Sequence, residues 1–373
     1  EGKVTGRRLK QVNPEILTSI LLVSATILAL IMSNTGLREE YHYVFNDIKI
    51  FGEFNLHLLI NDLLMAIFFL VVGCEIKYEI LHGHLSSVKK AAFPVVAACG
   101  GVALPAIIFL MSNYNTRFSN GIGIPISTDI AFGVGVFMVF KNKLDPSLKV
   151  FLLSLAVVDD LISILVIGIA YSSDINLVGI IGAIGVMCIL IYMNKILKVK
   201  KAMPYMVVGI ALWFFVYISK IHSTISGVLL AAVIPSRKVG DNQSSADKLE
   251  HKLSKLSNLV ILPLFAFANT SIALNLNVDV ADASNLVMGI ICGLVIGKPL
   301  GVVSFSFIAT KLHIAEKPEK ASWISIAEVA LLTGIGFTMS IFVSELAFSY
   351  DESVINLAKI SILTASMISV IMT

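Results

Sequence analysis

Charged side chains are scarce in this sequence. Asp, Glu, Lys and Arg together make up 14% of the 373 residues, against roughly 25% in a typical soluble domain. The hydrophobic residues make up 57%, and the mean hydropathy is +0.88. A soluble particle of this size cannot bury so much apolar surface while carrying so little charge. The composition therefore predicts a single integral-membrane domain over residues 1–373. It excludes a disordered chain, a disulfide-rich secreted fold and a nucleic-acid-binding protein.

Cysteine is also scarce. The four cysteines lie in apolar stretches: Cys74, Cys99, Cys188 and Cys292. None of them belongs to a CxxC pair of the kind that metal and redox centres use. We therefore interpret them as small core residues, and we expect no bound cofactor.

Long apolar stretches dominate the rest of the chain. A helix that crosses the bilayer core needs about 20 mostly apolar residues. Cutting the sequence at charge clusters, Pro and Gly predicts an all-α protein with about twelve transmembrane helices. Their expected limits are 15–33, 58–80, 91–111, 121–140, 149–171, 177–194, 203–218, 221–234, 256–276, 285–310, 322–347 and 354–373.

The basic residues predict how these spans are oriented. Most of the 28 Lys and Arg residues fall in loops that twelve crossings place on one side of the membrane. Such a bias marks the cytoplasmic side, and it predicts that both termini are cytoplasmic. The seventh and eighth spans are short, and one broken segment there would instead put the termini on opposite sides. Outside the membrane, residues 45–56 alternate around a Gly, which is typical of a β-hairpin, although an irregular loop fits about equally well.

Four ionisable residues lie near the middle of predicted spans. These are Asp129 in the fourth span, Asp159 and Asp160 in the fifth, and Lys298 in the tenth. A charge at this depth costs roughly 2.5–3.5 kcal/mol or more, so such residues usually mark a functional site. A fixed intramembrane salt bridge is the alternative, and it is easier to accept for Lys298 alone than for all four residues together.

The two neighbouring aspartates favour a cation site. Adjacent residues on a helix point about 100° apart, so two separate roles are expected for Asp159 and Asp160. One acid can pair with Lys298 while the other faces a water-filled cavity. Two nearby carboxylates also repel, which raises the proton affinity of at least one. Carboxylate and hydroxyl oxygens suit a hard cation such as Na⁺ or Li⁺, and competition between a proton and such a cation for the same oxygens is already an exchange mechanism.

The fourth and eleventh spans share a second peculiarity. Each is interrupted by glycines, and the fourth also by Pro125. Paired interruptions of this kind point to the broken helices of an inverted-repeat transporter, whose unwound backbone must lie inside the protein. Asp129 would then offset the positive helix N-termini and Lys298 the negative C-termini. Glycine-mediated close packing of unbroken helices is the alternative.

Several motifs resemble those of the NhaA-type Na⁺/H⁺ antiporters along nearly the whole chain. The matching stretches are Asn61-Asp62-Leu63-Leu64-Met65-Ala66-Ile67-Phe68-Phe69, Val72-Gly73-Cys74-Glu75, Ser127-Thr128-Asp129-Ile130-Ala131-Phe132, Val158-Asp159-Asp160-Leu161, Ile261-Leu262-Pro263-Leu264-Phe265-Ala266-Phe267-Ala268-Asn269, Gly297-Lys298-Pro299-Leu300-Gly301 and Thr333-Gly334-Ile335-Gly336-Phe337-Thr338. In this order and at these spacings the set is specific for the family.

The resemblance implies a fold and an activity. It implies twelve helices in inverted repeats, with the interrupted fourth and eleventh helices crossing, and electrogenic exchange of cytoplasmic Na⁺ or Li⁺ for external protons in a bacterial inner membrane. Asp160 would be the principal cation ligand and proton carrier, with Asp159 as its partner. Lys298 would pair with Asp159, while Asp129 and Thr128 would lie at the helix crossing, with Thr128 a further candidate ligand. Homodimers would form through the extracytoplasmic hairpin.

The resemblance also implies activation at alkaline pH. The candidate pH-sensing residues are Glu75, Glu79, Glu250 and His251. Solvated charges at helix ends are the alternative for each of them. Tyr78 stands where the family has Arg, and Ser254 where it has a second His, so the activation profile is expected to differ. Lys359, outside all these motifs, is interpreted as a side chain that snorkels to the membrane surface.

Two other functions compete with antiport. A Na⁺-coupled symporter of a small organic anion would need Arg or amide anchors, and Lys298 is the only basic group near the middle of the predicted bundle. An intramembrane aspartyl protease would need its two acids on separate helices, one of them after Gly-x-Gly. We therefore expect a transporter and not an enzyme.

Overall fold

The computed structural model describes residues 13–51, 54–140, 145–171, 176–236, 244–272, 280–318 and 321–373. Each of the twelve predicted stretches contains a helix. In the first half of the chain the elements are α1 (Pro14–Ser33), α2 (Arg38–His42), η1 (Tyr43–Asp47), β1 (Lys49–Phe51), β2 (Phe54–Asn55), α3 (Leu56–Leu58), η2 (Leu59–Leu64), α4 (Met65–His82), η3 (His84–Ser86), α5 (Val88–Ser112), η4 (Ser119–Gly123), α6 (Ile130–Val139) and α7 (Pro146–Ala170). The second half contains α8 (Leu177–Lys195), α9 (Ala202–Ile218), α10 (Ile225–Val233), α11 (Ser245–Leu256), η5 (Ser257–Ile261), α12 (Leu262–Asn269), α13 (Val280–Ile291), η6 (Cys292–Gly297), α14 (Lys298–Lys311), α15 (Trp323–Thr333), α16 (Phe337–Ala347) and α17 (Glu352–Met372).

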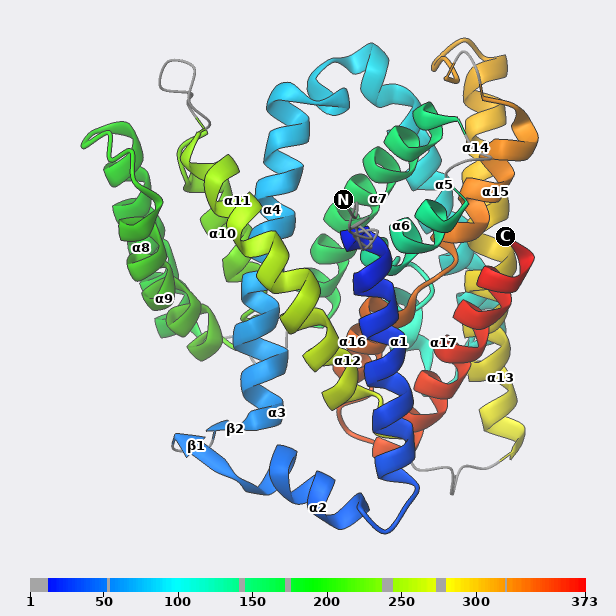
Figure 1. Ribbon diagram of the computed structural model, residues 1–373, viewed down its shortest axis with the longest axis horizontal. Coiled ribbons are helices and arrows are strands. Elements are labelled where there is room, and N and C mark those ends of the chain that lie inside the picture. The colour runs from blue at the N-terminus through cyan, green and yellow to red at the C-terminus, as the bar shows by residue number, and fades with distance from the viewer. Residues whose placement is uncertain are drawn as a thin grey trace, which may run out of the picture.

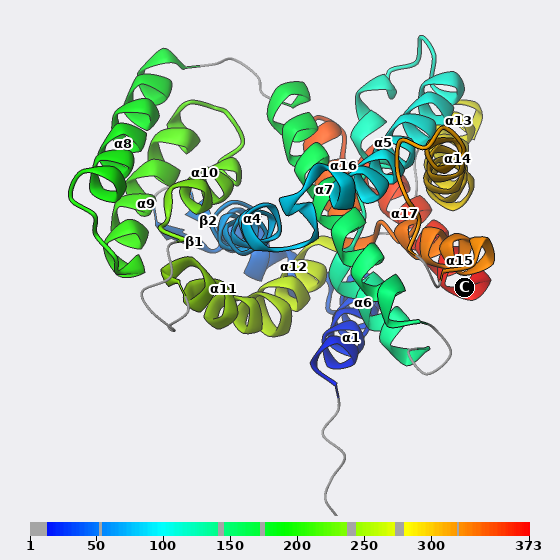
Figure 2. The ribbon, with the colours of Figure 1, turned by 90° about the horizontal axis from the view of Figure 1, so that it is seen from above.

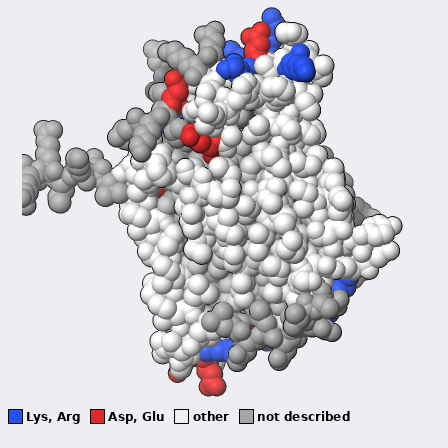
Figure 3. Space-filling view, turned by 90° about the vertical axis from the view of Figure 1, so that its right-hand side faces the viewer, with Lys and Arg blue, Asp and Glu red and all other residues white. Residues whose placement is uncertain are grey.

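The helices form a bundle of membrane-spanning dimensions (Figure 1). Within the described part of the chain, seven helices are long and apolar enough to cross a bilayer, and α15 with α16, bent by 44° at their junction, adds an eighth. Charged residues on the face shown in Figure 3 gather mostly toward its two ends, with a broad uncharged band between them. The predicted class, an all-helical polytopic membrane protein, is confirmed, while the count of twelve crossings stays a prediction.

The seventh and eighth spans are separate short helices. A turn containing Lys220, whose φ is 60°, separates α9 from α10. The two helices then pack together, so closely that a Cβ on Gly209 would lie 2.4 Å from Leu230 Cδ2. This packing favours two spans over one broken segment.

The bundle has two sides, which are visible from above (Figure 2). The helices α8, α9 and α10 lie on one side of α4, and α5, α13, α14, α15 and α17 lie on the other. Between these groups, α7, α6, α12, α16 and α1 surround the middle of the molecule. The larger of the two apolar cores covers the middle and the α5–α14 side, and the smaller one lies among α8, α9, α10 and the neighbouring part of α4.

Proline shapes the tenth span. Lys298 is followed by Pro299, which has no N–H to donate to the preceding turn. The six residues before Lys298 form the π-helical turn η6. A second π-helical turn, η5, precedes Pro263 in the ninth span. Such turns are a common way for a helix to absorb a lost hydrogen bond, and here one of them leads directly into the buried lysine.

The stretch expected to form a hairpin contains two paired strands. β1 pairs with β2 as a short antiparallel ladder in which Lys49 lies opposite Asn55.

Cys74 is buried, as expected, but Cys99 and Cys188 are exposed. The core interpretation is therefore wrong for these two, because a small apolar side chain is equally suited to a surface that faces lipid.

The backbones of α5 and α14 approach each other closely. A Cβ on Gly301 would lie 2.0 Å from the carbonyl oxygen of Gly100, and a Cβ on Gly100 would lie 2.2 Å from the carbonyl oxygen of Gly301. No side chain fits at either position unless the two backbones move apart.

We predict that Gly301→Ala lowers the free energy of unfolding by about 1–3 kcal/mol, the usual cost of overpacking. The measurement is the thermal unfolding of the purified protein in detergent. The matched control is Gly185→Ala on α8, where a Cβ meets nothing within 4 Å, so its melting temperature is expected to hold or rise slightly. Equal melting temperatures for the two variants would contradict the proposed contact.

Candidate functional site

Helix α7 presents two buried carboxylates in different directions. Asp145 begins the helix by accepting a hydrogen bond from the backbone N–H of Ser147 at 2.8 Å. Asp159 and Asp160 follow nearly four turns later and are 2% and 3% exposed. Because they point about 100° apart, they have different neighbours.

Asp159 is held by charged and polar partners. Its Oδ2 accepts hydrogen bonds from Lys298 Nζ at 2.8 Å and from Thr128 Oγ1 at 2.6 Å. Lys298, 1% exposed, also donates to the carbonyl of Ile126. Asp159 Oδ1 is buried, and among the described residues it has no hydrogen-bond partner. This carboxylate is therefore fixed through one oxygen and retains one oxygen able to accept a proton or a ligand.

Asp160 faces a cavity instead. The cavity has a volume of about 280 Å³, and its walls include Asp160, Asp129, Thr338, Glu250 and Lys149. Within the part of the chain that the structure describes, no side-chain hydrogen bond is found to the carboxylate of Asp160. A buried carboxylate without protein donors must be neutralised or solvated by whatever enters the cavity.

The two interrupted spans meet beside this cavity. Residues 127–129 and 335–336 are not helical, and the backbone N–H of Asp129 donates to the carbonyl of Ile335 at 2.8 Å. The Thr128 hydroxyl lies 3.1 Å from the carbonyl of Thr333. The interruptions expected from the glycines are therefore present, and they contact each other directly.

Asp129 joins the starts of two helices. Its Oδ1 accepts from the N–H of Phe132 at 2.9 Å in the first turn of α6. Its Oδ2 accepts from the N–H of Thr338 at 3.1 Å and from the Thr338 hydroxyl at 2.5 Å in the first turn of α16. One carboxylate thus satisfies orphan donors at two positive helix ends. The sequence motifs do not assign a role to Thr338. Its position just after the second interruption corresponds to that of Asp129 after the first, and this is the signal that could have indicated it.

The four candidate pH-sensing residues do not all reach the cavity. Glu75 of α4 and Glu250 of α11 lie in its wall, together with Ser254. Glu79 is not part of this wall, and His251 is exposed on α11. The structure therefore brings Glu75 and Glu250 together with Asp160, and leaves Glu79 and His251 outside the cavity wall.

Sequence similarity to known proteins shows the family of this chain. The family model described as Na⁺/H⁺ antiporter 1 matches residues 10–373. The chain belongs to the NhaA-type Na⁺/H⁺ antiporter family. Na(+)/H(+) antiporter NhaA 2 of Aliarcobacter butzleri is 44% identical, over 96% of this chain and 93% of the relative. Na(+)/H(+) antiporter NhaA of Flavobacterium psychrophilum is 40% identical, over 98% and 94%, and that of Helicobacter pylori strain 26695 is 38% identical, over 96% and 92%.

Membership of the NhaA family decides between the competing classes. The relatives are named as Na⁺/H⁺ antiporters, which are transporters and not enzymes. Na⁺/H⁺ exchange therefore has support from the family, and Na⁺-coupled anion symport and intramembrane proteolysis have none.

We predict that Lys298→Ala lowers the free energy of unfolding by about 3–5 kcal/mol, because Asp159 is then buried without its partner. Thermal unfolding in detergent measures the loss. In the double variant Asp159→Asn/Lys298→Ala the orphaned charge is gone, so part of the stability should return. A melting temperature of Lys298→Ala equal to that of the wild type would show that the pair contributes nothing.

Glu250 provides a test of stability against pH. Burial raises the pKa of the Glu250 carboxyl above its ordinary value of 4.5, and Asp247 adds to this while His251 opposes it. The folded state then holds the proton more tightly than the unfolded state, so this contribution to stability is complete below pH 4.5 and is lost as the pH rises through the raised pKa. Glu250→Gln has no such loss. Its melting temperature relative to the wild type should therefore increase from pH 4 to pH 8, and a difference that shrinks over this range would contradict the assignment.

Proposed function

We propose that this NhaA-family protein exchanges cytoplasmic Na⁺ or Li⁺ for external protons at Asp160, electrogenically and by alternating access. The observation that carries the proposal is the contrast between neighbours: Asp159 is hydrogen-bonded to Lys298 and Thr128, whereas Asp160 faces the cavity. A hard cation prefers oxygen ligands, and exchange for a proton needs an oxygen that can lose one. Asp160 lines the cavity without a side-chain hydrogen bond from the described residues, whereas Asp129 in the same wall is already hydrogen-bonded.

The exchange follows from competition for one set of oxygens. At alkaline cytoplasmic pH the Asp160 carboxyl loses its proton to water in the cavity, and Na⁺ takes its place. The further ligands that we propose are the Thr128 hydroxyl, which donates to Asp159 at 2.6 Å, and Asp159 Oδ1, which has no hydrogen-bond partner among the described residues. The site then opens to the other side, where protons bind the carboxylates and Na⁺ leaves.

Electrogenic exchange moves unequal numbers of protons and sodium ions per cycle. We propose that protons are in excess and that Asp159 is the second proton carrier. A proton on Asp159 weakens its pair with Lys298, and a sodium ion beside it competes with the ammonium group. The 2.8 Å contact is therefore expected to open and close in step with the cycle. Asp129 remains ionised as the compensating charge of the two helix N-termini.

The cavity supports an inward-facing arrangement. It reaches Lys149 and Glu250, which belong to the loops and helix ends predicted to be cytoplasmic. The β1–β2 pairing lies toward the opposite end of the bundle (Figure 1). We propose twelve crossings with both termini in the cytoplasm of a bacterial inner membrane, interrupted spans that cross as inverted repeats, and a homodimer joined through the extracytoplasmic hairpin.

The pH response is proposed to arise at the mouth of the cavity. Glu75 and Glu250 share its wall with Ser254, so loss of their protons makes the entrance more attractive to Na⁺. Since Ser254 replaces a histidine of the family pattern, one titrating group is missing from this wall.

We predict that Asp160→Asn abolishes Na⁺-dependent collapse of a pH gradient in everted vesicles, because an amide cannot exchange a proton for Na⁺. Glu352→Gln, which removes an exposed carboxylate in the first turn of α17, is the control and should transport like the wild type. Gradient collapse that survives in Asp160→Asn would refute the proposed role.

A further inference from the structure

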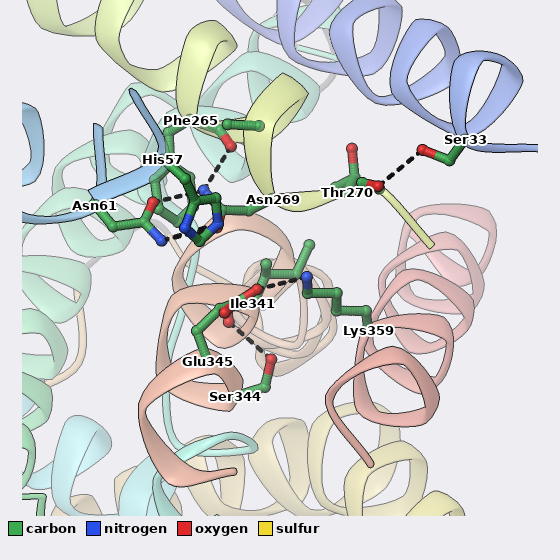
Figure 4. A network of polar contacts seen from close by, with 12 residues as sticks. Ser33, His57, Asn61, Phe265, Asn269, Thr270, Ile341, Ser344, Glu345 and Lys359 are labelled. Carbon is green, nitrogen blue, oxygen red and sulfur yellow. Dashed lines mark hydrogen bonds and ion pairs between the residues drawn. The ribbon is translucent and has the colours of Figure 1, made fainter. Parts of the chain in front are cut away.

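A second buried ion pair lies away from the Asp160 cavity. Glu345, in the last turn of α16, contacts Lys359 of α17, with 2.5 Å between Oε1 and Nζ. Their side chains are 17% and 6% exposed. The snorkelling expected for Lys359 is therefore wrong: the ammonium group turns inward to a carboxylate (Figure 4).

Polar side chains from other elements surround this pair. Asn61 and Asn269 exchange two amide hydrogen bonds of 2.8 and 3.0 Å, and His57 Nε2 lies 3.1 Å from Asn269 Oδ1. Figure 4 shows these three residues close to Glu345 and Lys359. The other titratable groups around them are Tyr41, whose hydroxyl donates to the carbonyls of Phe267 and Ala268, and His42, which is paired with Asp47. We call Glu345, Lys359, His57, Asn61 and Asn269 the outer cluster.

An aromatic layer separates the outer cluster from the cavity. Phe342 of α16 packs against Phe69 of α4 and Phe265 of α12, with ring centroids 6.0 Å apart in each pair. The three rings are 0–3% exposed. These side chains have no polar atom that could bind water or carry a proton.

The three helices share one register. Each contributes at least one residue to the cavity wall, one ring to the aromatic layer and one residue to the outer cluster. In this order the residues are Thr338, Phe342 and Glu345 on α16, Leu262, Phe265 and Asn269 on α12, and Val72, Phe69 and Asn61 on α4 with η2. On α16 and α12 the steps are three or four residues, which keeps side chains on one helix face. On the third segment Val72 and Phe69 of α4 are three residues apart, and Asn61 lies eight residues before Phe69, in η2. The layer therefore lies between the cavity and the outer cluster along all three segments.

We propose that Glu345 is a second proton-binding site, which receives protons from the exterior and passes them to Asp160 when the aromatic layer opens. This inference rests on the proposed antiport. In the step, water outside gives a proton to a Glu345 carboxylate oxygen, and the contact with Lys359 loosens. The same proton later leaves for the Asp160 carboxylate through water, and Glu345 pairs with Lys359 again.

A proton suits this site better than Na⁺. The Glu345 carboxylate already has an ammonium group at 2.5 Å, which a sodium ion would have to displace. The cavity around Asp160 is lined by neither member of this pair. A proton needs no coordination shell, and the amides and imidazole of Asn61, Asn269 and His57 provide donors and acceptors that can order water.

The test uses variants that separate proton transfer from folding. Glu345→Gln alone leaves Lys359 buried and unpaired, so it is paired with the double variant Glu345→Gln/Lys359→Met, which removes both charges. In proteoliposomes we measure Na⁺ efflux against external pH at fixed internal pH, and thermal unfolding of the same samples. We expect the double variant to fold, and its efflux at neutral external pH to fall about tenfold, a modest effect for a lost proton-transfer group. Efflux should return on external acidification, while the dependence on internal pH stays unchanged.

The other outcomes are equally informative. Glu345→Asp keeps a carboxyl group and should keep most of the external-pH response. If the double variant recovers both the melting temperature and the wild-type external-pH profile, the pair is only structural and the inference is wrong. Failure of the antiport proposal is distinct, because Asp160→Asn would then retain exchange whatever the behaviour of Glu345.

Discussion

The pairing of Lys298 with Asp159 is the interaction on which the rest of the site depends. Either group alone would be strongly destabilising at this depth, because an uncompensated charge in a low-dielectric interior costs several kcal/mol. Together they neutralise one another at 2.8 Å. Adjacent residues on a helix point about 100° apart, so the pairing of Asp159 with Lys298 leaves Asp160 on another face of α7, where it lines the cavity. The unpaired acid is therefore a consequence of the paired one.

The two interrupted spans also contain buried polar groups that need partners, because their backbone is not helical at the breaks. Where α6 and α16 begin, N–H groups without helical partners would be exposed to an apolar surrounding. Asp129 accepts hydrogen bonds from both helix starts, and the backbone of Asp129 donates across to Ile335. The interruptions therefore satisfy each other, which explains why a pair of them is tolerated where a single one would be costly.

The sequence predicted features that depend on local composition. The glycines and Pro125 located the breaks, and the isolated mid-span charges located the site, because both signals can be read without knowing the partners. It did not predict which helix face each side chain would occupy. His251 and Glu250 are neighbours in the sequence, yet Glu250 lines the cavity and His251 is exposed, since the rotation of α11 is set by its packing on α4. Lys359 resembled a snorkelling residue because its carboxylate partner belongs to another helix and leaves no periodic signal.

The glycine contact between α5 and α14 limits how the protein can rearrange. With the backbones at Gly100 and Gly301 touching, neither helix can slide or rotate along the other without a clash of main-chain atoms. We therefore expect these two helices to move together during a change of access, and Lys298, which lies on α14 three residues before Gly301, to move with them. The distance between Lys298 and Asp159 then depends on how far these two helices move relative to α7.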